Sequence, residues 1–274
     1  FEKGLNLATL KSQPIDGVAF YDRDSNRVVQ GKDIPRIKDV DTIPSPYLTG
    51  LLDKFFDTNL TPISETNRGC PYRCTYCCQG LSSHSQIDFF SLERVKDEIR
   101  YITDRVKNTN ILFFADSNFG ILARDTEIAQ YVAKLMKDTG YPRKLNVNWA
   151  KNQPKLFEIA KILNNINLII SVQSLDEVVL KNIKRQNIQV SVFKDILENV
   201  NREGGMSGTE IILALPGETK ESHLESLRKL FDWNVSYIIC YNCLILEGSE
   251  LGLAKETGEF QCTTKFRLID NSFG

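Results

Sequence analysis

Three cysteines stand close together in one short stretch of the chain, Cys70-Pro71-Tyr72-Arg73-Cys74-Thr75-Tyr76-Cys77. Cysteine thiolates hold iron–sulfur clusters, and a cluster fully coordinated by protein takes four of them. A group of three therefore predicts a different site, in which three corners of a four-iron cluster are bound and the fourth iron is open to another ligand. Pro71 restricts the backbone after the first cysteine, which suits a compact loop.

Zinc and unliganded thiols are the alternatives to this prediction. Cys74 and Cys77 have a spacing that zinc sites also use, and Cys240 with Cys243 could supply a second pair. Cys262 could instead join Cys240 and Cys243 in an auxiliary cluster. Residues three apart on a continuous strand point to opposite faces, which disfavours both arrangements. We interpret Cys78 as a spare thiol, and Cys243 as a thiol that could face a radical.

The spacing Cys70-x3-Cys74-x2-Cys77, with Tyr76 before the third cysteine, resembles the signature of the radical S-adenosylmethionine (SAM) enzymes. Glu65-Thr66-Asn67-Arg68-Gly69-Cys70-Pro71 and Ile43-Pro44-Ser45-Pro46-Tyr47 resemble the branch that carries an N-terminal cobalamin-binding domain. The resemblance runs over residues 15–250 and is strongest at 61–78. The cobalamin-binding pattern Asp-x-His-x-x-Gly is absent from this sequence.

The resemblance implies an enzyme with a [4Fe-4S] cluster on Cys70, Cys74 and Cys77 and with SAM on the open iron. It implies methyl transfer, or a related radical reaction, at an unactivated carbon of a small molecule. Cobalamin would be a cofactor of the intact protein, and a reductant such as flavodoxin or ferredoxin would be a partner. The alternatives are a cobalamin-independent radical SAM enzyme and a non-catalytic iron–sulfur or zinc module.

Composition narrows the remaining classes. The 274 residues are 42% hydrophobic and 25% charged, which is enough for one large domain, and the net charge is −1. No basic excess indicates nucleic-acid binding, and no apolar run is long enough for a membrane span. Seven cysteines without a secretion signal favour reduced thiols in the cytoplasm. We expect the chain, which begins at Phe1, to be a piece of a longer protein.

An alternation of strands and helices begins at residue 61. Apolar runs predict strands at 61–66, 110–115, 145–149, 168–172, 209–215 and 235–241. Helices are predicted from the caps Ser91 and Thr219, from Asp125 and Pro154, and over 192–203. Six such units favour parallel sheet, whereas a complete eightfold barrel needs about 250 residues. The predicted fold is therefore α/β, a partial (β/α)6 barrel of the radical SAM type.

The flanking segments are predicted to be accessory. Residues 1–60 read as a linker or strap that follows a missing N-terminal domain, with a hairpin at 17–29 and a short helix at 48–56. Residues 61–250 would be the radical SAM core. Residues 251–274 would be a C-terminal extension.

Polar residues follow the predicted strands, at the barrel edge where active sites lie. After the cysteines, they are Asp116, Asn118, Trp149, Asn152, Gln173, Ser174, Pro216, Gly217, Glu218, Tyr241, Asn242 and Cys243. Glu210 lies within a strand and could point into the barrel, where a carboxylate needs a partner. We expect His84 and His223 to be surface residues rather than ligands.

The resemblance also implies which residues bind SAM. Tyr76 would contact the adenine, and Asp116 the ammonium group. Gln173 and Ser174 would contact the carboxylate or ribose, and Arg185 could hold a carboxylate through two hydrogen bonds.

Pro216 and Gly217 match the branch, and Gly217 permits close approach of a ligand to the backbone. Each assignment has a structural alternative. These are a packed loop aromatic for Tyr76, a turn residue for Asp116, a solvated helix face for Arg185 and a strand-to-helix turn for Gly217.

Overall fold

The computed structural model describes residues 13–151, 153–165 and 167–265. The chain divides after Val40 into two compact units. In the first, β1 (Ala19–Asp22) pairs antiparallel with β2 (Arg27–Gln30), which confirms the predicted hairpin. Asn26 takes a φ of 52° in the turn between them, a conformation that asparagine tolerates.

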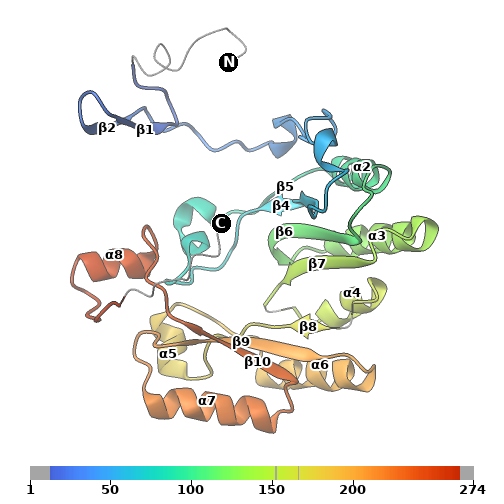
Figure 1. The fold of residues 1–274 in the computed structure, drawn as a ribbon. Helices are drawn as coiled ribbons and strands as arrows, with labels where there is room; N and C mark the ends of the chain where they lie inside the picture. The colour runs from blue at the N-terminus through green and yellow to red at the C-terminus, as the bar shows by residue number, and fades with distance from the viewer. Residues whose placement is uncertain (1–12, 152, 166, 266–274) are drawn as a thin grey trace. The chain divides into compact units, whose positions relative to one another are not determined.

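Six parallel strands form the framework of the second unit (Figure 1). One sheet holds β3 (Ile63–Ser64), β6 (Ile111–Phe119) and β7 (Lys144–Trp149) in that order. The other holds β8 (Leu168–Ile169), β9 (Ser207–Leu213) and β10 (Tyr237–Asn242). Every pairing within these two sheets is parallel, as predicted for a partial barrel. Within the described ranges no ladder joins β7 to β8, so the barrel is not closed.

Helices connect these strands. They are α2 (Leu92–Thr103), α3 (Asp125–Thr139), α4 (Leu156–Ile162), α6 (Val190–Arg202) and α7 (Lys220–Asp232). The predicted caps are confirmed at two of them, because Ser91 Oγ accepts from Arg94 N and Thr219 Oγ1 from Ser222 N. Two shorter helices are α5 (Glu177–Asn182) and α8 (Glu250–Glu256).

Two local predictions differ from the structure in helix type or boundary, and one feature was missed. Residues 48–56 form turns and a 3-10 helix at Asp53–Phe55, because Gly50 has a φ of 74°, which an α-helix excludes. Helix α4 begins at Leu156 rather than at Pro154. A short antiparallel pair, β4 (Asn67–Arg68) with β5 (Asp88–Phe89), was not predicted. Further 3-10 helices lie at Val40–Thr42, Cys78–Gly80 and Ser82–His84.

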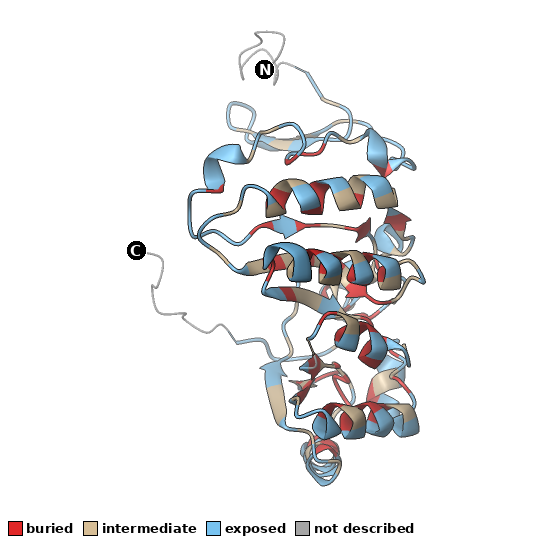
Figure 2. Cartoon of the chain, turned by 90° about the vertical axis from the view of Figure 1, so that its right-hand side faces the viewer, coloured by how far each residue is buried: buried red, intermediate tan, exposed pale blue. Residues whose placement is uncertain are grey.

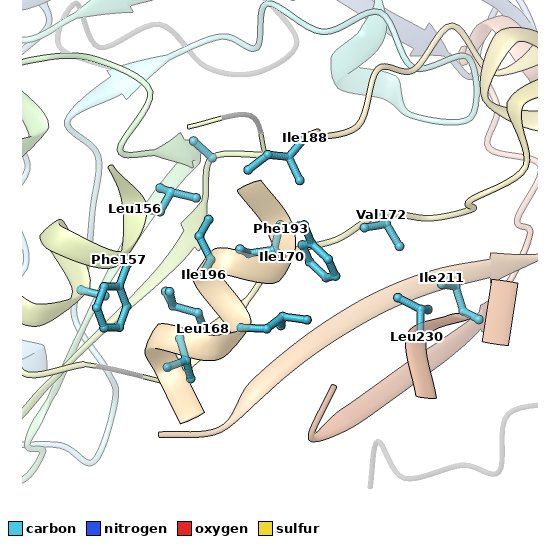
Figure 3. Packing of buried hydrophobic residues seen from close by; sticks show 14 residues of the cluster. Leu156, Phe157, Leu168, Ile170, Val172, Ile188, Phe193, Ile196, Ile211 and Leu230 are labelled. Carbon is cyan, nitrogen blue, oxygen red and sulfur yellow. The ribbon is translucent and has the colours of Figure 1, made fainter. Parts of the chain in front are cut away.

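The apolar faces of the helices pack on the strands. Figure 2 shows that the long helices carry buried residues alongside exposed ones, as amphipathic helices do. A cluster of buried side chains from α4, α6, β8 and β9 includes Leu156, Leu168, Ile196 and Ile211 (Figure 3). Because the cluster also includes Ala150 and Trp149 at the end of β7, it links the two sheets, which no ladder joins in the part of the chain that the structure describes.

Candidate active site

The three cysteines lie in a tightly turned loop, residues 69–80, which we call the cysteine loop. It directly follows β4, and Cys70 N donates to His84 O at 2.8 Å. Successive turns are closed by Cys77 N with Cys74 O at 3.1 Å and by Gly80 N with Cys77 O at 2.9 Å. A Cβ atom at Gly80 would lie 2.3 Å from Cys74 O, so the loop requires glycine there.

Backbone hydrogen bonds from Thr75 hold the cysteine loop against two other elements. Thr75 N donates to Ile183 O, just after α5, at 3.2 Å, and Leu251 N of α8 donates to Thr75 O at 2.8 Å. The same side of the molecule carries α5, α8 and the segment after β4 in Figure 1. The loop that carries the cysteines is therefore fixed by parts of the chain more than a hundred residues away.

Polar groups surround the sulfur atoms. Cys70 and Cys74 are buried and Cys77 is half-buried. Asn118 Nδ2 lies 3.2 Å from Cys70 Sγ, and Arg185 Nη1 lies 3.9 Å from Cys74 Sγ. A side-chain amide and a guanidinium group therefore lie beside two of the three sulfur atoms.

Buried polar atoms beside the cysteine loop are available to a bound group. Among the described residues, no three His, Cys, Asp or Glu side chains gather closely enough to hold one metal ion. Cysteines that hold a cluster bind different irons, so their sulfur atoms stand further apart than those around one zinc ion. Buried oxygen atoms of Thr75, Asn118 and Gln173 lack a hydrogen-bond partner in the described part of the chain. Such atoms near the loop suit a bound polar group.

A cavity of about 520 Å³ brings several predicted residues together. Two of its lining residues, Tyr76 and Cys77, belong to the cysteine loop. Gln173 lines it from the segment after β8, and Glu210 lines it from β9. Four asparagines add carboxamides to its wall, namely Asn146, Asn148, Asn165 and Asn167. Polar side chains outnumber apolar ones in this wall, so a bound ligand would find several hydrogen-bond partners there.

Gln173 and Ser174 differ in position although they are adjacent. Gln173 has a φ of 64°, its N donates to Glu210 O at 2.8 Å, and its side chain lines the cavity. Ser174 is buried outside the cavity wall, and its Oγ accepts from Asp176 N at 3.2 Å. Glu210 has the partner that a carboxylate in this position needs, because Ser171 Oγ donates to it.

Arg185 is buried, so its interpretation as part of a solvated helix face was wrong. Its Nη1 donates to Tyr76 Oη at 3.2 Å, and its Nε to Asn187 Oδ1 at 2.8 Å and Val172 O at 3.2 Å. Burial raises the pKa of Tyr76, so its hydroxyl is neutral and can accept this hydrogen bond. Arg185 thus connects the cysteine loop to the end of the fourth strand region.

Asp116 has its own set of partners. One carboxylate oxygen accepts from Thr66 N at 2.7 Å and Asn67 N at 3.3 Å. The other accepts from the Thr66 hydroxyl and from Asn67 Nδ2 at 2.9 Å. Burial raises its pKa to about 6, although these hydrogen bonds oppose the shift. In this structure Asp116 fastens the segment that leads into the cysteine loop.

Pro216 and Gly217 form the strand-to-helix turn and do not line the cavity. Pro216 O accepts from Asn182 Nδ2 at 3.0 Å, and a Cβ at Gly217 would lie 2.4 Å from that same atom. Their close neighbour in the structure is thus α5.

The prediction that His223 is a surface residue was wrong, because it is buried. Its Nδ1 lies 3.0 Å from Glu218 Oε1, and its Nε2 lies 3.7 Å from Cys240 Sγ. Cys243 lies elsewhere and lines a second cavity together with Cys262, where burial raises its pKa to about 11.

Two residues near the cysteine loop gained no specific role from the sequence. Asn118 is a buried residue near the end of β6, and its side chain contacts Cys70. Lys151 lies in the cavity wall. The position of a residue at or just after the end of a strand could have identified both. The sequence analysis used this criterion for Asn118 and Trp149 but did not extend it to Lys151. Asn152, also named from the sequence, lies outside the described residues.

The fold and this site define an enzyme class, and a family model agrees. The model of the radical SAM superfamily matches residues 64–230, so the chain belongs to this superfamily. Its members use a [4Fe-4S] cluster and SAM, and the donor set described above fits both. No helix in the described residues is long and apolar enough to cross a membrane.

Two curated relatives are methyltransferases by name, and the name of one of them includes cobalamin dependence. The cobalamin-dependent radical SAM methyltransferase TokK of Streptomyces tokunonensis is 36% identical over 214 residues, which is 74% of this chain and 31% of that protein. The 2-(S-pantetheinyl)-carbapenam-3-carboxylate methyltransferase of Streptantibioticus cattleyicolor is 34% identical over 221 residues, 77% of this chain and 32% of that protein. The chain thus spans about a third of the length of these relatives.

Solved structures share the fold. The radical SAM methyltransferase TsrM from Kitasatospora setae, solved with cobalamin and a [4Fe-4S] cluster, has a TM-score of 0.59 at 17% identity. That match covers 72% of this chain and 37% of TsrM. The cobalamin-dependent enzyme OxsB has a TM-score of 0.55 at 16% identity and covers 91% of this chain and 36% of OxsB. These likenesses confirm the predicted fold class.

Proposed function

We propose that this chain holds a [4Fe-4S] cluster on Cys70, Cys74 and Cys77 and uses it to cleave SAM. We further propose that the intact protein is a cobalamin-dependent methyltransferase acting on a small molecule. The supporting observation is that the cysteine loop and the polar cavity meet at Tyr76 and Cys77. The names of the two curated relatives support the methyl-transfer part.

When bound, the reduced cluster supplies the electron that breaks a C–S bond of SAM, and cobalamin supplies a carrier for the methyl group. The chain's own residues bind and orient the ligand, which accounts for much of an enzyme's rate advantage. In this proposal Tyr76 holds the adenine, while Gln173 and Glu210 offer polar contacts from the cavity wall. Arg185 keeps Tyr76 in place through its hydroxyl and offers positive charge beside Cys74.

The remaining predicted SAM contacts stay part of the proposal. Asp116 already has four hydrogen-bond donors, and Ser174, Pro216 and Gly217 lie outside the cavity wall. Any role of theirs in SAM binding would therefore be exerted by holding the backbone near the ligand. Residues 61–250 would be the catalytic core, residues 1–60 a linker and residues 251–274 an extension.

The proposal includes two features of the cellular context. An external one-electron donor, such as flavodoxin or ferredoxin, would reduce the cluster. The protein would work in the cytoplasm, where cysteines stay reduced. The seven cysteines of the sequence support this, since the structure records the cysteines as free.

Anaerobic reconstitution with iron and sulfide tests the proposal. The wild-type chain, given SAM and a reductant, should produce 5′-deoxyadenosine. Cys74→Ala should abolish the product, while Cys78→Ala should leave it unchanged, because Cys78 is exposed and its Sγ contacts Glu247 O instead.

Other results would favour the alternatives. A wild-type chain that binds iron fully but yields no 5′-deoxyadenosine would contradict the enzyme assignment and favour a non-catalytic module. Product formation by an intact protein that neither binds nor needs cobalamin would contradict only the methyltransferase part.

A further inference from the structure

Lys151 is placed against the cysteine loop by two separate observations. It lies two residues after β7 and shares the cavity wall with Tyr76 and Cys77. Its Nζ is 5.5 Å from the ring centroid of Tyr72, which stands between Cys70 and Cys74. A cation–π contact of this kind holds an ammonium group over the ring.

No carboxylate in the described part of the chain forms an ion pair with this ammonium group. Burial lowers the pKa of Lys151, as does the positive charge of Arg185, while Cys74, Cys70 and Cys77 raise it. Lys151 is half-buried, and a charge partly withdrawn from water is costly unless it has a compensating charge nearby. The negative groups that act on Lys151 are the sulfur atoms of the cysteine loop, whereas the Glu210 carboxylate in the same cavity wall accepts from Ser171 Oγ.

Arg185, the other cation beside the loop, is used differently. Its guanidinium donates to the carbonyl oxygens of Val172 and Ser171 and to Asn187. These bonds fix the end of the fourth strand region. Apart from its contact with the Tyr72 ring, the Lys151 ammonium group forms no hydrogen bond or ion pair within the described ranges, so its charge is available to the site itself.

We propose that Lys151 raises the reduction potential of the cluster held by Cys70, Cys74 and Cys77, and so makes the cluster easier to reduce. This inference rests on the proposed function. Reduction by an external one-electron donor adds one negative charge to a site that already carries three thiolates. A nearby positive charge in a water-poor environment stabilises the more negative state more than the less negative one. Charge and burial are known determinants of cluster potentials.

A redox titration of the reconstituted chain, followed by electron paramagnetic resonance, measures this effect without any turnover. Lys151→Met removes the charge and keeps much of the side-chain volume, whereas Lys151→Arg keeps the charge. Lys144→Met is the matched control, because Lys144 lines the same cavity from the other end of β7. The five residue steps of β7 from Lys144 to Trp149 span about 17 Å, and Lys151 follows Trp149 by two residues.

At a fixed potential we expect the ratio of reduced to oxidised cluster to be about tenfold lower in Lys151→Met than in wild type, which corresponds to about 59 mV for one electron. Lys151→Arg and Lys144→Met should titrate like wild type. Equal potentials in wild type and Lys151→Met, at equal iron content, would overturn the inference and leave the proposed function standing. If Lys151→Met assembles no cluster, Lys151→Gln provides the same comparison. A wild-type chain that assembles no cluster would instead refute the proposed function and this inference with it.

Discussion

Asp116 shows how a single buried group organises the approach to the cysteines. Its carboxylate receives hydrogen bonds from the backbone and side chains of Thr66 and Asn67, immediately before the cysteine loop. These bonds orient β4, from which the loop departs, and Asn118 from the same strand as Asp116 contacts Cys70. The end of β6 thus supports the cysteine loop at two residues, through Asp116 just before the loop and through Asn118 at Cys70.

The raised pKa of Asp116 gives a testable pH dependence. Its folded-state pKa of about 6 exceeds the ordinary value of 3.8, so between these values the folded chain holds a proton that the unfolded chain releases. Stability should therefore fall as pH rises through this window, by about 3 kcal/mol at most. Urea unfolding of the metal-free chain should show this fall in wild type relative to Asp116→Asn. The prediction would be contradicted if the difference in free energy of unfolding between the two proteins stayed constant from about pH 4 to about pH 6, the window that the two pKa values define.

At the scale of elements, the helices hold the strands whose ends form the site. Phe193 of α6 is 2% exposed and its ring centroid lies 6.1 Å from that of Trp233, just after α7. It packs in the cluster with Val172, Ile211 and Leu230 (Figure 3). The positions of Gln173 and Glu210 depend on this packing, because Val172 and Ile211 are their neighbours in sequence.

Removing this side chain should be costly. Phe193→Ala leaves a cavity in a close-packed core and should lower the free energy of unfolding by about 3 to 5 kcal/mol. Phe231→Ala is the control, since Phe231 is 79% exposed on α7, and its effect should stay within about 0.5 kcal/mol. Urea denaturation of both variants measures this. Similar losses in the two would show that α6 does not carry the packing assigned to it.

Elements were predicted better than the contacts between them. Apolar runs located all six strands, and Ser91 and Thr219 correctly marked helix starts, because these signals are local. The partners of Asp116 and Arg185 could not be predicted, since they lie far along the chain and depend on how strands and loops meet. The β4–β5 pair was missed because two-residue strands carry no periodicity.

At the scale of the whole molecule, the open barrel places the cysteine loop in the wall of the cavity that its strands also line. Asn118 near the end of β6 contacts Cys70, and Gln173 shares the cavity wall with Cys77, although these residues are far apart in sequence. Family membership fits this architecture, and the account depends on one feature of it. Three cysteines must hold the cluster while one iron stays open to SAM.

The most direct measurement is the electron paramagnetic resonance spectrum of the reduced, reconstituted chain with and without SAM. The account predicts a [4Fe-4S] signal in wild type that changes when SAM is added, because SAM becomes a ligand of the open iron. It also predicts no such cluster signal in a variant with Cys70, Cys74 and Cys77 replaced by alanine. A wild-type spectrum that saturating SAM leaves unchanged would contradict the account, as would a cluster that persists without these three cysteines.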